Sequence, residues 1–382
     1  MSFDLAIVGA GIAGLWTARL AAAAGLRAVV LEAETLGAGA SGTPLGALLP
    51  HLPRSMSDKK RFQFVALAEL EGLITQLEEE TGRTTGYVRA GRIMPIRTER
   101  FRASVSQAID EAVQSWRSSH GPFELTLDDT SSVGGWLSAQ EAPLGIVRDT
   151  LSARVRADDY LATLATSLDH RTELRQGVRV TGFDAAAGRV QTSLGTLPET
   201  VGALVVTAGV GSFPLFERLL ARPFGAGVKG QAAVFELTEE NQVDAINTPV
   251  IYDNGVYLVP RDTRHIAAGA TSERAYAEPV TAKPEDADAF ISRATSLCPA
   301  LAGARLVKHW AGVRPRAEAK DPLVGCLDPT QRAWALTGGY KITFGIAHRL
   351  ARRLIEEITG APELTPIPDT YEASFHLAQS SL

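Results

Sequence analysis

The chain begins with an apolar run, a glycine-rich turn, a helix of small residues and a second apolar run that ends in an acid. In order, these are residues 3–8, the G-x-G-x-x-G glycines Gly9, Gly11 and Gly14, residues 15–24, residues 27–31, and Glu32. This order predicts a strand–helix–strand unit of the kind that binds an adenine dinucleotide. It constrains the fold strongly, because two parallel strands require a crossover helix and a sheet that is covered.

Each glycine of the turn has a separate physical task. Gly9 allows a tight turn out of the first strand, Gly11 lets the backbone approach a pyrophosphate, and Gly14 lets the helix pack closely on the sheet. The free N–H groups at the start of the helix favour a phosphate. Glu32 is placed to accept a hydrogen bond from a ribose hydroxyl, and its charge argues against the 2′-phosphate of NADP.

Composition is that of an ordinary globular protein. The 382 residues allow about two domains of about 150 residues. The net charge of −5 argues against a general nucleic-acid binder. The two cysteines, Cys298 and Cys326, and the seven histidines form no ligand-spaced pattern, so we expect neither a metal site nor a disulfide framework. We also expect no signal peptide and no membrane span, and hence a cytoplasmic location.

Apolar periodicity predicts helices and strands in mixed succession. We expect helices over residues 59–80, 98–118, 157–168 and 285–297, and a last helix after Gly338-Gly339 that ends near residue 358. We expect strands over residues 87–96, 178–183, 190–194, 203–207, 228–237, 250–252, 256–260, 265–270 and 333–337. The dinucleotide-binding part is then discontinuous (1–55, 150–225 and 319–382), and residues 56–149 and 226–318 form a mainly β second domain.

Four further patches accompany the N-terminal unit. They are residues 39–50, residues 205–212, residues 255–261 with 269–273, and residues 311–316 with 321–325 and 338–343. In this order the five patches resemble the D-amino acid oxidase (DAO) family of FAD-dependent amine oxidoreductases, above all its glycine oxidase-like members and the oxidase domain of a bifunctional enzyme that modifies a tRNA wobble uridine. The resemblance implies an α/β fold (α+β overall), with a Rossmann-like FAD-binding domain of the glutathione-reductase type and a second, mainly antiparallel β substrate domain.

The resemblance implies a non-covalent FAD. Together with the N-terminal unit, it places these residues against the cofactor: Gly9, Gly11, Ile12, Ala13, Gly14, Glu32, Ala33, Ala40, Ser41, Gly42, Gly46, Ala47, Leu48, Val178, Ala208, Gly209, Arg314, Gly338, Gly339, Tyr340, Lys341, Ile342 and Thr343. Val178 would pair with the adenine edge. Residues 338–343 would face the pyrimidine end of the flavin, where a helix N-terminus stabilises the reduced anionic ring. A core role for Val178 and a solvated Lys341 are the open alternatives.

Three residues are candidates for the catalytic centre. Arg314 stands where similar family members bind a substrate carboxylate, a task suited to a planar, charged and bidentate guanidinium. Tyr257 matches the family's tyrosine on the strand over the flavin. His51 follows Leu49-Pro50 and either faces the ring or is a loop histidine. A salt bridge from Arg314 to Asp321 or another acid and a purely structural role for Tyr257 remain alternatives.

The resemblance implies an enzyme that oxidises the C–N bond of an amino acid or secondary amine carrying a carboxylate. Hydride would pass to flavin N5, the imine would hydrolyse, and O2 or another acceptor would take the electrons. One alternative is removal of the carboxymethyl group from a modified tRNA wobble uridine, with the basic run 59–61 as a contact. Another is the flavin subunit of a multi-subunit amine dehydrogenase. The sequence predicts neither the substrate nor the oligomeric state.

Overall fold

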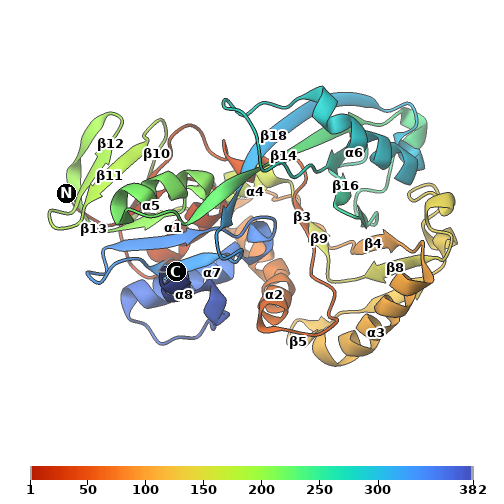
Figure 1. Ribbon diagram of the computed structural model, residues 1–382, viewed down its shortest axis with the longest axis horizontal. Helices are drawn as coiled ribbons and strands as arrows, with labels where there is room; N and C mark the ends of the chain where they lie inside the picture. Colours follow the sequence, from red (N-terminus) through yellow and green to blue (C-terminus); the bar gives the residue numbers. More distant parts are fainter. Residues whose placement is uncertain (1, 380–382) are drawn as a thin grey trace.

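The computed structural model describes residues 2–379, and the chain forms two large β-sheets with helices packed on them (Figure 1). The first sheet runs β10–β2–β1–β13, and β20 and β19 extend it beyond β13. Its strands are Phe3–Val8 (β1), Ala28–Leu31 (β2), Thr172–Arg175 (β10), Gly195–Val206 (β13), Leu323–Cys326 (β19) and Ala333–Thr337 (β20). All neighbours are parallel except β19 and β20. This is the arrangement of a dinucleotide-binding sheet.

The first half of β13 reaches beyond the parallel core. There it pairs antiparallel with Arg189–Thr192 (β12), which pairs with Val180–Asp184 (β11). The expected hairpin is therefore present, and the strand expected at 203–207 is the second half of a strand of 12 residues.

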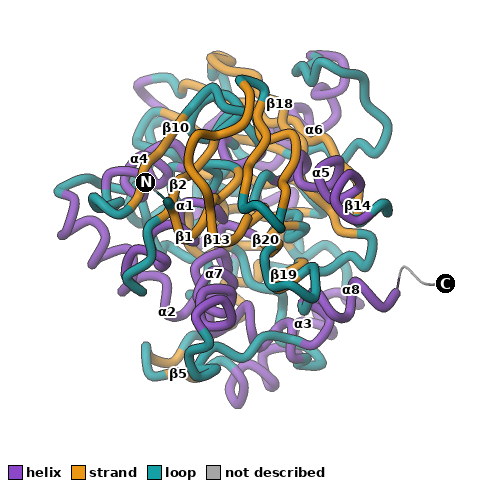
Figure 2. Tube along the Cα trace, turned by 90° about the vertical axis from the view of Figure 1, so that its left-hand side faces the viewer, coloured by secondary structure: helices purple, strands orange, loops and turns teal. Residues whose placement is uncertain are grey.

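The β1–α1 contact is very close, as the sequence predicts. Helix α1 (Ile12–Ala23) begins directly after the glycine turn, and β1, β13 and β20 lie side by side next to it (Figure 2). A Cβ atom on Gly14 would lie 1.9 Å from the carbonyl oxygen of Gly9 and 2.7 Å from Oγ1 of Thr207. The turn itself needs glycine at position 9, where φ is +101°.

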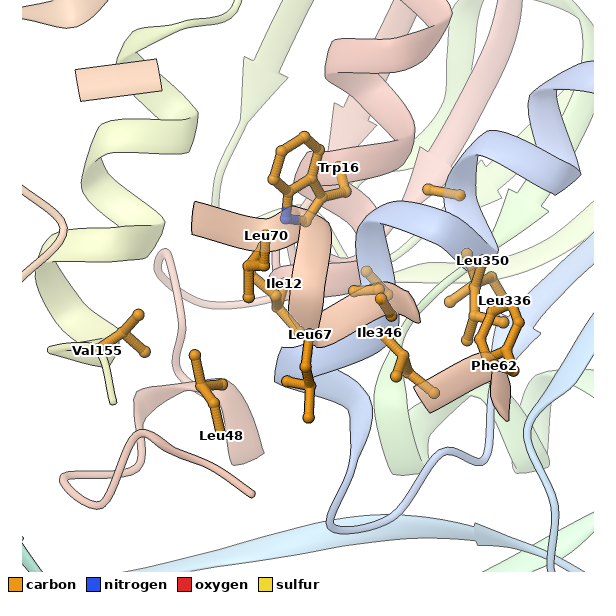
Figure 3. Packing of buried hydrophobic residues seen from close by; sticks show 14 of the residues in the cluster. Ile12, Trp16, Leu48, Phe62, Leu67, Leu70, Val155, Leu336, Ile346 and Leu350 are labelled. Atoms are coloured by element: carbon orange, nitrogen blue, oxygen red, sulfur yellow. The ribbon is translucent and has the colours of Figure 1, made fainter. Parts of the chain in front are cut away.

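Four helices pack together on one side of the first sheet. They are α1, Asp58–Thr81 (α2), Ala157–Thr166 (α4) and Thr343–Thr359 (α7). Figure 3 shows side chains of α1, α2 and α7 gathered in one buried cluster; its labelled members include Ile12, Trp16, Leu67, Leu70, Ile346 and Leu350. Helix α2 lies in the segment expected to belong to the second domain, yet it packs against α7 and α4.

The second sheet runs β18–β14–β17–β16–β15–β4–β8–β7. Its strands are Arg92–Pro95 (β4), Leu125–Asp128 (β7), Ile146–Asp149 (β8), Gly225–Glu236 (β14), Val250–Asp253 (β15), Val256–Pro260 (β16), His265–Gly269 (β17) and Arg305–Ala317 (β18). Every neighbouring pair is antiparallel except β15 and β4. Helix α6 (Pro284–Leu297) covers one face, and the other face turns Val259 and Tyr257 toward Leu45.

The remaining elements are shorter or lie at the margins. They are Glu99–Ser115 (α3), Ser212–Leu220 (α5), Ala373–Gln379 (α8), Ala47–Leu48 (β3) paired with Ala153–Arg154 (β9), and Arg117–Ser118 (β5) paired with Gly121–Pro122 (β6). The expected α/β fold class with its antiparallel second sheet is confirmed, whereas α5 and α8 were not expected. Within residues 2–379, no helix has the length and apolar character needed to cross a bilayer.

We predict that Gly14→Ala destabilises the protein by about 2–3 kcal/mol, because the new methyl group pushes α1 off β1. Gly72→Ala is a matched control: Gly72 lies inside α2, and a Cβ there would meet open space. It should raise stability by about 0.5–1 kcal/mol through helix propensity. Denaturant unfolding measures both. A Gly14→Ala protein as stable as the parent would mean that the close contact is not needed.

Candidate active site

A cavity of about 380 Å³ extends between the two sheets. Four parallel strands point their carboxyl ends at it. Val8, Leu31 and Thr337 are the last residues of β1, β2 and β20, Thr207 directly follows β13, and all four line the cavity. Ligands of open α/β sheets bind at this edge, outside the carboxyl ends of the strands. Residues of β16 and β18 line the same cavity from the second sheet.

Glu32 holds the glycine turn at one end of the cavity, which we term the nucleotide end. One carboxylate oxygen accepts from the N–H of Ala10 at 2.8 Å and the other from the N–H of Glu34 at 2.9 Å. The backbone N–H of Val178 donates to the Glu32 carbonyl at 2.8 Å, so this N–H is already engaged. Glu32 and Val178 both line the cavity, where the carboxylate keeps further acceptor capacity for a ribose hydroxyl.

The loop before β3 closes over the start of α1. The hydroxyl of Ser41 accepts from the N–H of Ile12 at 3.1 Å, which satisfies one free donor of the helix. Ala40, Gly46 and Ala47 line the cavity with it. The structure therefore brings this loop to the glycine turn, as expected.

Most of the predicted cofactor residues line the cavity, and four do not. The lining residues are Gly9, Gly11, Ile12, Ala13, Glu32, Ala33, Ala40, Ser41, Gly46, Ala47, Val178, Ala208, Gly209, Arg314, Gly338, Gly339, Tyr340, Lys341 and Thr343. Gly14, Gly42, Leu48 and Ile342 lie behind this surface. Gly42 is close to the Gly37 carbonyl and Leu48 is buried in the core, so their contribution is to packing.

The opposite part of the cavity, its aromatic end, consists of Tyr257, Trp310, Arg314, Tyr340 and Lys341. The Cζ atom of Arg314 lies 6.0 Å from the ring centroid of Tyr340. The amino nitrogen of Lys341 lies 5.6 Å from the Tyr340 centroid and 6.0 Å from that of Tyr257. Two cations and three aromatic side chains thus meet where β18, β16 and the turn before α7 approach one another.

Arg314 reaches this position because the neighbouring strand has no side chain beneath it. A Cβ on Gly230 of β14 would lie 2.1 Å from a terminal nitrogen of Arg314. The guanidinium donates to the carbonyl of Thr271 at 3.1 Å. Asp321, the alternative partner considered for Arg314, pairs instead with Lys59 at 2.6 Å. Arg314 therefore forms no ion pair with any of the carboxylates that the structure describes.

Burial controls the protonation of Tyr257. Desolvation, with a smaller effect of the neighbouring Tyr252, raises the pKa of Tyr257 to about 12. The two rings pack with centroids 4.9 Å apart. The phenol therefore stays neutral at ordinary pH and can donate a hydrogen bond.

The N-terminus of α7 points its first residues at the cavity. Thr343 and Phe344 line it, and the N-cap residue Ile342 makes no side-chain cap. The N–H of Tyr340 donates to the Pro315 carbonyl at 3.0 Å, which joins the turn to β18. The free donors and the positive end of the helix dipole favour negative charge here.

His51 and the basic run lie outside the cavity lining. The His51 ring is exposed, and its Nδ1 lies 2.6 Å from Oε1 of Gln63. In the basic run, Lys60 contacts the Arg54 carbonyl and Arg61 donates to the Ser115 carbonyl at 2.7 Å. Among residues 2–379, no group of three or more His, Cys, Asp or Glu side chains is arranged to hold a metal ion.

Trp310 is a lining residue that sequence reasoning missed. On β18 it lies on the same strand face as Gly312 and Arg314, because these residues are spaced two apart. Its ring lies over Gly312, where a Cβ would be 2.4 Å from the indole. The signal was the alternation Trp310–Gly312–Arg314 along one strand face. Ala270, at the end of β17, lines the cavity beside it.

The parallel sheet, its glycine turn and the second sheet that faces it form the architecture of a dinucleotide-dependent oxidoreductase. The family model described as FAD dependent oxidoreductase (DAO) matches residues 4–355, and the chain belongs to this family. This confirms the expected family and its cofactor, FAD.

Three similar proteins align with nearly the whole chain. The glycine oxidase of Pseudomonas putida is 27% identical over 399 aligned residues, covering 96% of this chain and 98% of that protein. The crystal structure of glycine oxidase from Geobacillus kaustophilus matches with a TM-score of 0.83 at 21% identity, covering 96% of each chain. L-proline dehydrogenase from P. horikoshii matches with a TM-score of 0.82 at 16% identity, covering 99% of this chain and 98% of that one. The chain is therefore glycine oxidase-like, and the two structures show its fold.

Proposed function

We propose that the protein oxidises the C–N bond of an amino acid or a secondary amine that carries a carboxylate. The observation that carries the proposal is Arg314: a guanidinium in the cavity of a flavin-dependent oxidoreductase, with only a backbone carbonyl as its hydrogen-bond partner. Such a group binds a carboxylate through two parallel hydrogen bonds. The relatives named for glycine and for proline act on small amines of this kind.

The cavity fits FAD held without a covalent bond. Gly9 and Gly11 leave the turn free of side chains at the start of α1, Glu32 offers a ribose acceptor, and the uncapped start of α7 offers donors to an anionic ring edge. When bound, FAD supplies the hydride acceptor at N5 and passes the electrons to O2 or another acceptor.

The chain's own residues bind and orient the amine. Arg314 holds the carboxylate, and Tyr257 donates a hydrogen bond from a phenol that stays neutral. The positive charges of Arg314 and Lys341 disfavour an ammonium beside them, so they lower the pKa of the bound amine and favour its reactive neutral form. The imine product leaves the cavity and hydrolyses in water.

We predict that the purified holoenzyme is yellow and is bleached without oxygen by at least one carboxylate-bearing amine. The measurement is flavin absorbance under anaerobic conditions, across D- and L-amino acids, sarcosine, proline and hydroxyproline. Amines of similar size without a carboxylate are the control and should leave the flavin oxidised. An oxidised flavin across the whole panel would contradict the proposal.

Arg314→Ala should raise KM for carboxylate-bearing amines by about 10- to 100-fold, because a charge-assisted pair contributes about 1.5–3 kcal/mol. Arg314→Lys keeps the charge but loses the planar fork, so its KM should lie between that of the parent protein and that of Arg314→Ala. Steady-state kinetics on the best substrate of the panel measures both. An unchanged KM in Arg314→Ala would remove this residue from the carboxylate role.

The pH dependence should report the substrate amine and not Tyr257. Because the neutral amine reacts, kcat should rise with pH through the pKa of the bound amine, which the two cations hold below that of the free amine. The Tyr257 phenol, with a pKa of about 12, does not titrate in this range. Tyr257→Phe should therefore keep the inflection; its disappearance in that variant would assign the titration to the phenol.

A further inference from the structure

The aromatic end of the cavity holds two cations from different parts of the fold. Arg314 belongs to the edge strand β18, and Lys341 lies in the turn before α7. Their charged groups lie 6.0 Å and 5.6 Å from the centroid of one ring, Tyr340. Both residues line the same cavity, so both charged groups face one ligand space.

Neither cation forms an ion pair with any carboxylate that the structure describes. Arg314 has five N–H donors and makes one hydrogen bond, to the Thr271 carbonyl. The amino group of Lys341 contacts two aromatic rings and makes no hydrogen bond or ion pair within residues 2–379. Its side chain is exposed and lines the cavity, so the amino group can reach a ligand there.

The acids of the region are committed elsewhere. The carboxylates among the described lining residues are Glu32, which accepts from two backbone N–H groups, and Glu34, which lies 3.5 Å from Arg179. Glu273 follows the strand that ends near Arg314, but its carboxylate pairs with Lys229 at 2.9 Å. Among the described side chains, no carboxylate forms an ion pair with either cation at the aromatic end; Glu273 acts on the charge of Arg314 without pairing with it.

The environment of the two cations disfavours their charged forms. Partial burial and the charge of Arg314 lower the pKa of Lys341, and burial lowers that of Arg314. Such charges are unfavourable until an anion arrives. One carboxylate neutralises one of them, and a second carboxylate neutralises the other.

We propose that the site is built for an amine with two carboxylates, an amino- or imino-dicarboxylate of short chain. Arg314 binds the carboxylate next to the reacting C–N bond through its planar fork. Lys341 is the specificity-determining residue and binds the second carboxylate as a point charge. This inference rests on the proposed oxidation of a carboxylate-bearing amine at the same site.

The test uses the holoenzyme and two probes with no C–N bond to oxidise. Thiodiacetate has two carboxylates, and (methylthio)acetate is the matching monocarboxylate. Dissociation constants come from the change in flavin absorbance on binding, with calorimetry as a second readout. We expect thiodiacetate to bind at least tenfold more tightly to the parent protein.

Three variants assign the preference to Lys341. Lys341→Met should bring the ratio of the two dissociation constants close to one, and Lys341→Arg should keep most of it. Arg316→Met is the matched control: Arg316 has its Cζ 5.4 Å from the Tyr340 centroid but does not line the cavity. It should change the ratio by less than twofold. Flavin content and the melting temperature establish that each variant is folded.

Equal binding of the two probes by the parent protein would overturn the inference, and this result needs no variant. An unchanged ratio in Lys341→Met would also overturn it, and a shifted flavin reduction potential in the same variant would place the amino group's role at the flavin.

Anaerobic bleaching separates this inference from the proposed function. If sarcosine bleaches the flavin and the probes bind equally, only the dicarboxylate inference fails. If thiodiacetate is preferred but no amine bleaches the flavin, including iminodiacetate, the anion site stands and the proposed oxidation fails.

Discussion

The whole site depends on a backbone contact between the end of β18 and the turn before α7. The N–H of Tyr340 donates to the Pro315 carbonyl, and Arg316 pairs with Gly339 as an isolated bridge. This contact joins the second sheet to α7, which packs on the first sheet. It requires glycine at 338, where φ is +79° and a Cβ would lie 2.7 Å from that of Ala317. Without it, Arg314 and Lys341 would not share one cavity.

The structural features that could be predicted from the sequence are those determined by neighbouring residues in the chain. A G-x-G-x-x-G turn acts through backbone freedom and close approach, so Gly9 and Gly14 have the same meaning in the sequence as in the structure. Helices α2, α3 and α7 carry their apolar residues at helical spacing and were expected close to their true bounds. These elements need no knowledge of their neighbours.

The features that could not be predicted depend on contacts between residues far apart in the sequence. Strand β18 runs through Pro315, which lacks a backbone N–H, because β18 lies at the edge of its sheet. Trp310 lines the cavity because Gly312 leaves space for its ring. Helix α2 was assigned by chain order to the second domain, but burial packs it against α7. His51 pairs with Gln63, one helical segment away, and no sequence pattern shows that partner.

Charge is distributed unequally along the cavity, so its two ends favour ligand groups of different charge. At the nucleotide end, Glu32 is satisfied by backbone donors and Glu34 lies near Arg179, so the protein supplies its own compensation. At the aromatic end, Arg314 and Lys341 are left to the ligand. A dinucleotide with its ribose beside Glu32 leaves these cations free for the substrate. Beside these two cations an anionic ligand is favoured over a neutral or cationic one, because its charge reduces the repulsion between them.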